Sequence, residues 1–152
     1  MKLFVIVAAA CLAGLVLAGC ASNGAGPTSS TVSGALAVDS PQDGVVVYYM
    51  HRTFRCPTCL RIERMSRKAV QDAFAVELSS GRVQWRTLNY QEHENLARRY
   101  EVTAPSVVLV LYHDGAETSH QVLDRTWSLY SQPAEFQAYV VGAVRDCLEA
   151  VN

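Results

Sequence analysis

Apolar residues fall into two kinds of run after about residue 43, and these runs predict strands and helices. A continuous β-branched and aromatic run at 45–50 is typical of a strand covered on both faces. Residues 82–88 alternate between apolar and polar side chains, which predicts a second strand. Two more strands are expected at 107–112 and 118–123, because the Asp114-Gly115 pair between them is a strong hairpin signal.

Three stretches carry apolar residues at helical spacing. The first begins at Pro57, which suits the first turn of a helix, and it is expected to end at Ser79-Ser80-Gly81. A short crossover helix is expected within residues 89–101, and a last helix from Pro133, with residues 127–132 as a loop. The predicted order is β-α-β-α-β-β-α, which indicates a single α/β domain with one core.

The N-terminal segments have a different character. A positive charge at Lys2 precedes a run of roughly 15 apolar residues, which is short for a membrane span of about 20. The run ends in Leu17-Ala18-Gly19-Cys20, which resembles a bacterial lipobox. This resemblance implies a signal peptide at 1–19, cleavage before Cys20 and lipid attached to that residue. The alternatives are an ordinary signal peptide cut near an Ala-x-Ala site, or a short anchor.

The residues that follow indicate a tether and a compartment. Ser, Gly, Thr, Ala and Pro dominate the stretch 20–42, which shows no helix or strand period, so we interpret it as a flexible linker before a domain at 43–152. We expect the domain to be lipid-anchored in the cell envelope and extracytoplasmic, facing the periplasm in a Gram-negative cell. Ala21 stands where an aspartate favours inner-membrane retention, so it permits outer-membrane sorting.

Charge and cysteine usage exclude other classes. A net charge of −1 with a pI near 6.4 argues against a nucleic-acid binder, and no basic cluster contradicts this. Of the five cysteines, Cys11 would leave with the signal peptide and Cys20 would carry lipid. Only Cys56, Cys59 and Cys147 remain, too few and too unevenly placed for a disulfide-scaffolded fold.

The motif Cys56-Pro57-Thr58-Cys59 lies between the first predicted strand and the first predicted helix. Two thiols at this spacing can close a disulfide with each other. The free N–H groups and the dipole of a helix N-terminus stabilise a thiolate on the first cysteine, and a thiolate is the species that attacks a partner's disulfide. Arg55 adds a positive charge that would lower the pKa of Cys56 modestly.

Residues 44–150 resemble thioredoxin-like proteins, in which helices flank a central mixed sheet. The matches are the strand–CxxC–helix unit, the segment 100–108 with Pro105, and the hairpin at Asp114-Gly115. The resemblance implies that Pro105 follows a cis peptide bond and lies against the disulfide; a trans proline that opens a strand is the alternative. It also implies that Cys56 attacks and Cys59 resolves, while Pro57 and Thr58 tune the pair.

Residues 48–59 further resemble small thioredoxin-like proteins named as a nitrophenyl-compound nitroreductase subunit and associated with arsenic-resistance gene clusters. The chain has no flavin or nicotinamide fingerprint, so that resemblance implies electron delivery and no bound cofactor. The chain also departs from thioredoxin. Arg55 replaces the usual tryptophan, and Met50 stands where thioredoxin keeps a buried aspartate; His51 is a candidate proton shuttle in its place.

Three hypotheses follow from the two thiols. The first is a membrane-tethered thiol–disulfide oxidoreductase that exchanges with a protein partner and with an upstream electron donor or acceptor. The second is capture of copper(I), zinc or trivalent arsenic by Cys56 and Cys59. A third thiol is remote, because Cys147 would lie about 20 Å along the last helix. The third hypothesis, a structural disulfide, is disfavoured because so small a loop restrains the unfolded chain little.

Overall fold

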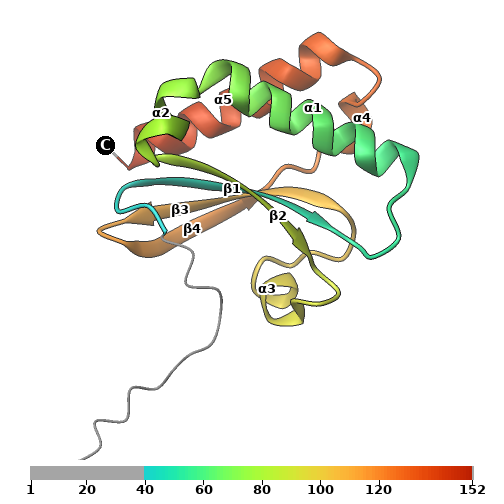
Figure 1. The fold of residues 1–152 in the computed structure, drawn as a ribbon, viewed down its shortest axis with the longest axis horizontal. Helices are drawn as coiled ribbons and strands as arrows, with labels where there is room; N and C mark the ends of the chain where they lie inside the picture. The colour runs from blue at the N-terminus through green and yellow to red at the C-terminus, as the bar shows by residue number, and fades with distance from the viewer. Residues whose placement is uncertain (1–39, 152) are drawn as a thin grey trace, which may run out of the picture. The chain divides into compact units, whose positions relative to one another are not determined.

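Four strands form one mixed sheet, in the order β2-β1-β3-β4 (Figure 1). The computed structural model describes residues 40–151. The expected signal peptide, the expected lipidation site Cys20 and most of the expected linker lie outside the described residues. The strands run over the ranges β1 Gly44–His51, β2 Val83–Asn89, β3 Ser106–His113 and β4 Ala116–Val122. β1 pairs in parallel with β2 and antiparallel with β3, and β4 closes a hairpin with β3.

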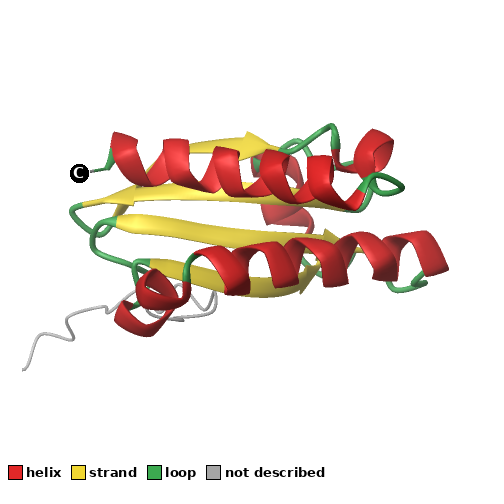
Figure 2. Cartoon of the chain, turned by 90° about the horizontal axis from the view of Figure 1, so that it is seen from above, coloured by secondary structure: helices red, strands yellow, loops and turns green. Residues whose placement is uncertain are grey.

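Helices cover the two faces of the sheet unequally. The two long helices α1 (Pro57–Ala73) and α5 (Pro133–Ala150) lie on one face together with the short α2 (Ala75–Ser80), as Figures 1 and 2 show. Of the described helices, α3 (Glu94–Arg99) alone lies on the other face. A single helical turn, α4 (Thr126–Leu129), precedes α5. α1 and α5 start at the same end of the sheet and run in the same direction.

The alternation of side chains along β1 divides the core into two clusters. Val45, Val47 and Tyr49 point to the face covered by α1 and α5, while Val46, Tyr48 and Met50 point to the face that carries α3. All six are buried. A strand with both faces covered has to be apolar throughout, which explains the uninterrupted run from which this strand was predicted.

The structure corrects one helix prediction and one loop prediction. The first long helix is not continuous: it breaks at Phe74, whose backbone (φ −128°, ψ 38°) belongs to neither helix. At about 1.5 Å per residue, the 17 residues of α1 already span the sheet, so the chain has to bend before it can enter β2. The predicted loop at 127–132 is also partly wrong, because α4 lies there; one turn is too short to show a periodic pattern.

The predictions made at glycine residues are confirmed. Gly81 ends α2 in the left-handed conformation (φ 79°) that favours glycine. Asp114 and Gly115 both have positive φ, 52° and 73°, as a two-residue hairpin turn requires. The expected helix within 89–101 is shorter than predicted, since it spans only Glu94–Arg99. No helix within residues 40–151 is long and apolar enough to span a bilayer.

Candidate active site

Cys56 occupies the N-cap of α1, with extended backbone angles (φ −76°, ψ 156°). Its sulfur accepts a hydrogen bond from the backbone N–H of Cys59 at 3.0 Å. The two cysteines are joined in a disulfide, with their Cα atoms 5.0 Å apart. A sulfur that accepts one of the unpaired N–H groups of a helix start lies where a negative charge is stabilised. The geometry therefore favours a thiolate at this position after reduction.

The residues between and after the two sulfurs differ in exposure. Pro57 is the first residue of α1 and is exposed, and Thr58 is half-buried. Cys59 is buried, and its backbone carbonyl accepts a hydrogen bond from the Tyr49 hydroxyl at 2.7 Å. Burial raises the pKa of Tyr49 to about 12, although the nearby Arg55 charge opposes this. Tyr49 therefore stays a neutral donor at physiological pH and ties β1 to the start of α1.

Arg55 directly precedes the motif and does not extend freely into solvent. Its guanidinium forms an ion pair with the carboxylate of Glu63, and its central carbon lies 5.9 Å from the centroid of the Tyr49 ring. The side chains of Arg55 and Glu63 are 27% and 16% exposed. Charges at this depth are screened less than charges on an open surface. A partly covered pair of opposite charges therefore lies at the start of α1, formed by the residue before Cys56 and a residue one turn after Cys59.

Pro105 lies at the same end of the sheet as the disulfide. Its neighbour Ser106 pairs with Met50, near the end of the strand that leads into the CxxC loop. Pro105 is buried, and its carbonyl accepts a hydrogen bond from the indole N–H of Trp127 at 2.8 Å. The isomer of the peptide bond before Pro105 stays a prediction. Trp127 belongs to α4, so this helical turn holds the start of β3 in place.

The structure combines three features. It has a four-stranded mixed sheet, a CxxC disulfide at the first turn of the helix after β1, and a proline directly before the strand β3, which is antiparallel to β1. The fold is thioredoxin-like.

Comparisons with solved structures find weak global similarity. The chain resembles the Trx4 domain of ERdj5 with a TM-score of 0.48 and 13% sequence identity, covering 68% of this chain and 82% of that chain. It resembles mitochondrial thioredoxin 3 of Saccharomyces cerevisiae, in its oxidised form, with a TM-score of 0.42 and 20% identity, covering 69% and 80%. It also resembles the zinc-bound form of human ERp44, with a TM-score of 0.48 and 12% sequence identity, covering 69% of this chain and 27% of that chain. No protein-family model and no curated relative matches the sequence.

The structure brings together most of the residues singled out in the sequence and adds three more. Cys56, Pro57, Thr58 and Cys59 form the start of α1, and Pro105 lies at the same end of the sheet. Glu63, Tyr49 and Trp127 contact this site but were not predicted as functional. Glu63 lies four residues after Cys59, a spacing that places both on one side of a helix, so its position could have been noticed. The Trp127 contact crosses 22 residues and leaves no local signal.

Two other residues considered for proton transfer have ordinary surroundings. Met50 is completely buried in the core on the face of the sheet that carries α3. His51 ends β1, and its Nδ1 lies 2.9 Å from the carbonyl oxygen of Arg52. A role for His51 as a proton shuttle stays a prediction.

Cys147 lies far from the pair. It is free and buried among the apolar residues that α5 packs against the sheet. Burial, with a smaller contribution from Asp146, raises the pKa of its thiol to about 11. Because α1 and α5 begin at the same end, the 14 residues from Pro133 to Cys147 place this thiol about 20 Å along the helix, away from the disulfide. A site that joins all three thiols does not fit this arrangement.

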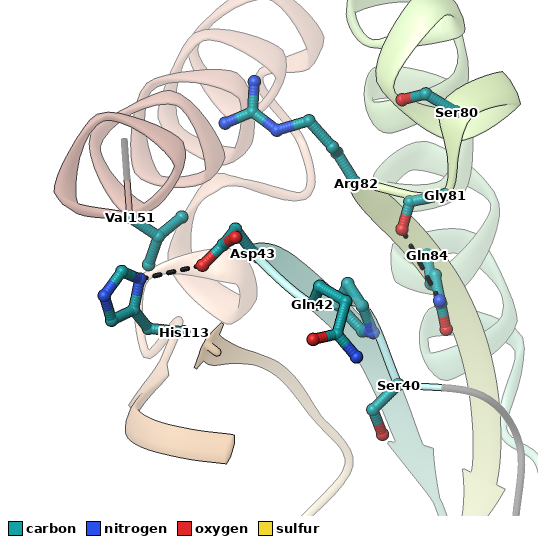
Figure 3. A pocket seen from close by; sticks show the side chains of 10 residues that line it. Ser40, Gln42, Asp43, Ser80, Gly81, Arg82, Gln84, His113 and Val151 are labelled. Atoms are coloured by element: carbon teal, nitrogen blue, oxygen red, sulfur yellow. Dashed lines mark hydrogen bonds and ion pairs between the residues drawn. The ribbon is translucent and has the colours of Figure 1, made fainter. Parts of the chain in front are cut away.

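Of two surface pockets formed by residues within 40–151, the larger lies at the opposite end of the sheet from the disulfide. It has a volume of about 680 Å³ and is lined by residues where β1 and β2 begin, including Asp43 and Arg82, and by His113 at the end of β3 (Figure 3). The smaller, about 520 Å³, lies beside α3. Neither includes a residue of the CxxC motif. We take the disulfide as the candidate active site, because its two sulfur atoms are the groups that undergo thiol–disulfide exchange.

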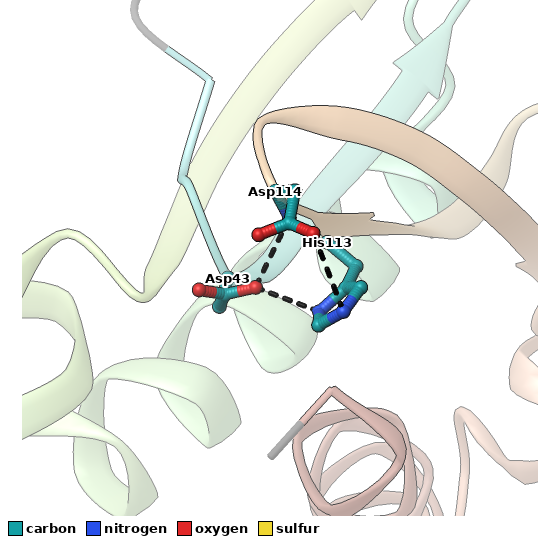
Figure 4. Close-up of side chains that lie close together, drawn as sticks. All are labelled: Asp43, His113 and Asp114. Carbon is teal, nitrogen blue, oxygen red and sulfur yellow. Dashed lines mark hydrogen bonds and ion pairs between the residues drawn. The ribbon is translucent and has the colours of Figure 1, made fainter.

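Asp43, His113 and Asp114 form a cluster at the edge of the larger pocket (Figure 4). An Asp43 carboxylate oxygen lies 2.8 Å from His113 Nδ1 and accepts the Asp114 backbone N–H at 3.1 Å. The backbone N–H of Gly115 donates to the Gln42 carbonyl at 2.8 Å. These bonds fasten the β3–β4 hairpin to the residues before β1, so we assign the cluster a structural role.

Proposed function

We propose that this protein is a thiol–disulfide oxidoreductase that acts on protein partners from a lipid anchor in the cell envelope. The observation that carries the proposal is the Cys56–Cys59 disulfide, with Cys56 at the N-cap of α1 and its sulfur accepting the Cys59 N–H. A helix start that stabilises a thiolate has a direct use in disulfide exchange. A structural disulfide gains nothing from that position, and so small a loop contributes little to stability.

The exchange proceeds in two steps. In the reduced protein, the Cys56 thiolate attacks one sulfur of a partner's disulfide, forms a mixed disulfide and releases the other partner sulfur as a thiolate. Cys59, after losing its proton, then attacks the Cys56 sulfur, closes the internal disulfide and releases the second partner thiolate. Two electrons have passed to the partner. An upstream dithiol restores the reduced form by the same steps in reverse.

The surroundings of the disulfide suit a protein partner. Phe54, in the loop that leads to Cys56, is 78% exposed, and Trp127, which contacts Pro105, is 39% exposed. Exposed aromatic side chains beside a reactive group are typical of protein-binding surfaces. The resemblance of residues 48–59 to the nitroreductase-associated proteins favours electron delivery as the direction of transfer.

The lipid anchor rests on the sequence Leu17-Ala18-Gly19-Cys20 and on the polar linker after it. Acyl chains on Cys20 would hold the domain at the membrane surface, and more than one chain is needed for stable attachment. Replacing Cys20 by serine should move the protein out of the membrane fraction. A Cys20→Ser protein that still carries lipid would contradict the proposal.

The reduction potential of the Cys56–Cys59 pair tests the redox proposal. The pair is equilibrated against glutathione in the full chain with Cys147 replaced by serine, so that no other domain thiol can exchange. A potential of about −270 mV or lower identifies a reductant, and one of about −120 mV an oxidant. If no Cys56–Cys59 disulfide forms at any ratio of oxidised to reduced glutathione, the redox proposal is overturned and soft-ion capture by the two thiols takes its place.

A further inference from the structure

The side chain of Arg55 is enclosed by groups from the two elements that hold the disulfide. The Tyr49 ring of β1 lies on one side of the guanidinium, and the Glu63 carboxylate of α1 pairs with it. The Nε atom of Arg55 is buried and has no hydrogen-bond partner among the described residues. A buried donor without an acceptor is costly, so the surroundings have to hold this side chain in place.

The same two partners also fix the start of α1. The Tyr49 hydroxyl donates to the Cys59 carbonyl at 2.7 Å, in the buried interior. Glu63 follows Cys59 by one helical turn and lies on the same side of α1. Tyr49, Arg55 and Glu63 thus form a brace between β1 and the first two turns of α1, with a positive charge on the residue beside Cys56.

We propose that this brace sets how readily Cys56 forms its thiolate: Arg55, held by Tyr49 and Glu63, favours the thiolate, and the Glu63 carboxylate limits that effect. Arg55 and Glu63 are positioning residues in this proposal, because they act through the charge at Cys56. The proposal rests on the redox function above and names the groups that tune it. Reduction creates a negative charge beside Arg55, and a nearby cation stabilises it while a nearby carboxylate opposes it.

Two single substitutions should shift the thiolate population in opposite directions. Glu63→Gln keeps the size of the side chain and an oxygen that can accept from Arg55, but it removes the negative charge. The fraction of Cys56 present as thiolate at a pH below its pKa should rise about threefold, the effect expected of one charge at this depth in a partly screened site. Arg55→Gln removes the cation and should lower that fraction by a similar factor.

The control lies in the same helix. Lys68 and Asp72 form an ion pair in α1 with a nitrogen–oxygen distance of 2.8 Å. Asp72→Asn therefore removes the same charge from an ion pair in the same helix, although this pair is the more exposed of the two. Asp72 follows Cys59 by 13 residues, which is about 20 Å along the helix. This variant should leave the thiolate population of Cys56 unchanged.

The measurement is the pH dependence of the rate at which iodoacetamide alkylates Cys56 in the reduced full chain purified in detergent, determined on the proteolytic peptide that contains this residue. The ratio of oxidised to reduced glutathione at half oxidation is measured on the same samples. Glu63→Gln should make the pair the stronger oxidant and Arg55→Gln the stronger reductant. If Arg55→Gln fails to fold, Arg55→Lys keeps the charge and should give a curve close to that of the unchanged chain.

Two results would overturn the inference. Alkylation curves for Glu63→Gln and Arg55→Gln that match the curve for Asp72→Asn would mean that the brace is only structural. Curves that move in the same direction would mean that the substitutions loosen the site and do not act through charge. Failure of the underlying function looks different, because the unchanged chain would then form no Cys56–Cys59 disulfide.

Discussion

At the scale of single residues, the three thiols of the domain differ in reactivity because their surroundings differ. Cys56 lies at a helix N-terminus, whereas Cys147 is only 6% exposed and its pKa is raised to about 11. We expect iodoacetamide to modify Cys56 quickly in the reduced protein at neutral pH and to leave Cys147 intact until the protein unfolds. Peptide-resolved mass spectrometry measures both rates in one sample.

Denaturant provides the control for this prediction. Adding urea should make the two cysteines react at similar rates, since the difference comes from the fold. Rapid modification of Cys147 in the native protein would mean that this part of α5 opens readily, contrary to its position in the core.

At the scale of elements, a close backbone approach holds the start of β1 against β2. The Val45 N–H donates to the Arg82 carbonyl at 2.8 Å, and a Cβ atom on Gly44 would overlap that same carbonyl oxygen. Gly44→Ala should therefore force the two strands apart and lower the free energy of unfolding by about 2–3 kcal/mol, which urea denaturation would measure. Backbone offers no flexible side chain that could move aside.

Gly142 in α5 is the matched control, because a Cβ atom there would meet nothing within 4 Å. Gly142→Ala replaces a glycine inside a helix and should raise stability by about 0.5–1 kcal/mol. Equal effects of the two substitutions would show that the approach of Gly44 to Arg82 imposes no constraint.

Elements with a local cause were predictable from the sequence. The apolar run of β1 and the Asp114-Gly115 turn are each predicted by the pattern of a few consecutive residues, and both are confirmed. The break at Phe74 has no such signal, because no proline or glycine marks it. It arises from the length of α1 relative to the sheet, which is a property of the assembled fold.

The same distinction applies to the candidate site. The spacing of Cys56 and Cys59 and the helix after them predict the disulfide and its place at a helix start. The partners of these residues come from contacts across the fold: Tyr49 reaches Cys59 from the neighbouring strand, and Trp127 reaches Pro105 from α4. A single sequence does not show which side chains meet in this way.

At the scale of the whole molecule, burial of phenol and thiol groups makes the folded state sensitive to alkali. Burial is the largest cause that raises the pKa of Tyr48, Tyr49, Tyr100 and Cys147; for Tyr49 it reaches about 12 and for Cys147 about 11. A group whose pKa is higher in the folded state contributes stability that is complete below its ordinary pKa. That contribution is lost as the pH rises through the folded value.

The ordinary values are 9.0 for cysteine and 10.0 for tyrosine, so the free energy of unfolding should begin to fall above pH 9 and fall more steeply above pH 10. Urea denaturation across this range measures the loss.

The variant Tyr49→Phe tests the contribution of one buried hydroxyl. It removes the hydrogen bond to the Cys59 carbonyl and should lower the free energy of unfolding by about 1 kcal/mol at neutral pH. It also removes a group whose pKa is raised by folding, so the stability of the variant should fall less steeply above pH 10. At about 1.4 kcal/mol per pH unit, the unchanged chain loses its advantage of about 1 kcal/mol within roughly one pH unit, so the two curves should cross at about pH 11. Curves that stay parallel throughout would mean that Tyr49 ionises equally in the folded and unfolded chains, and that the brace beside the disulfide is open to solvent.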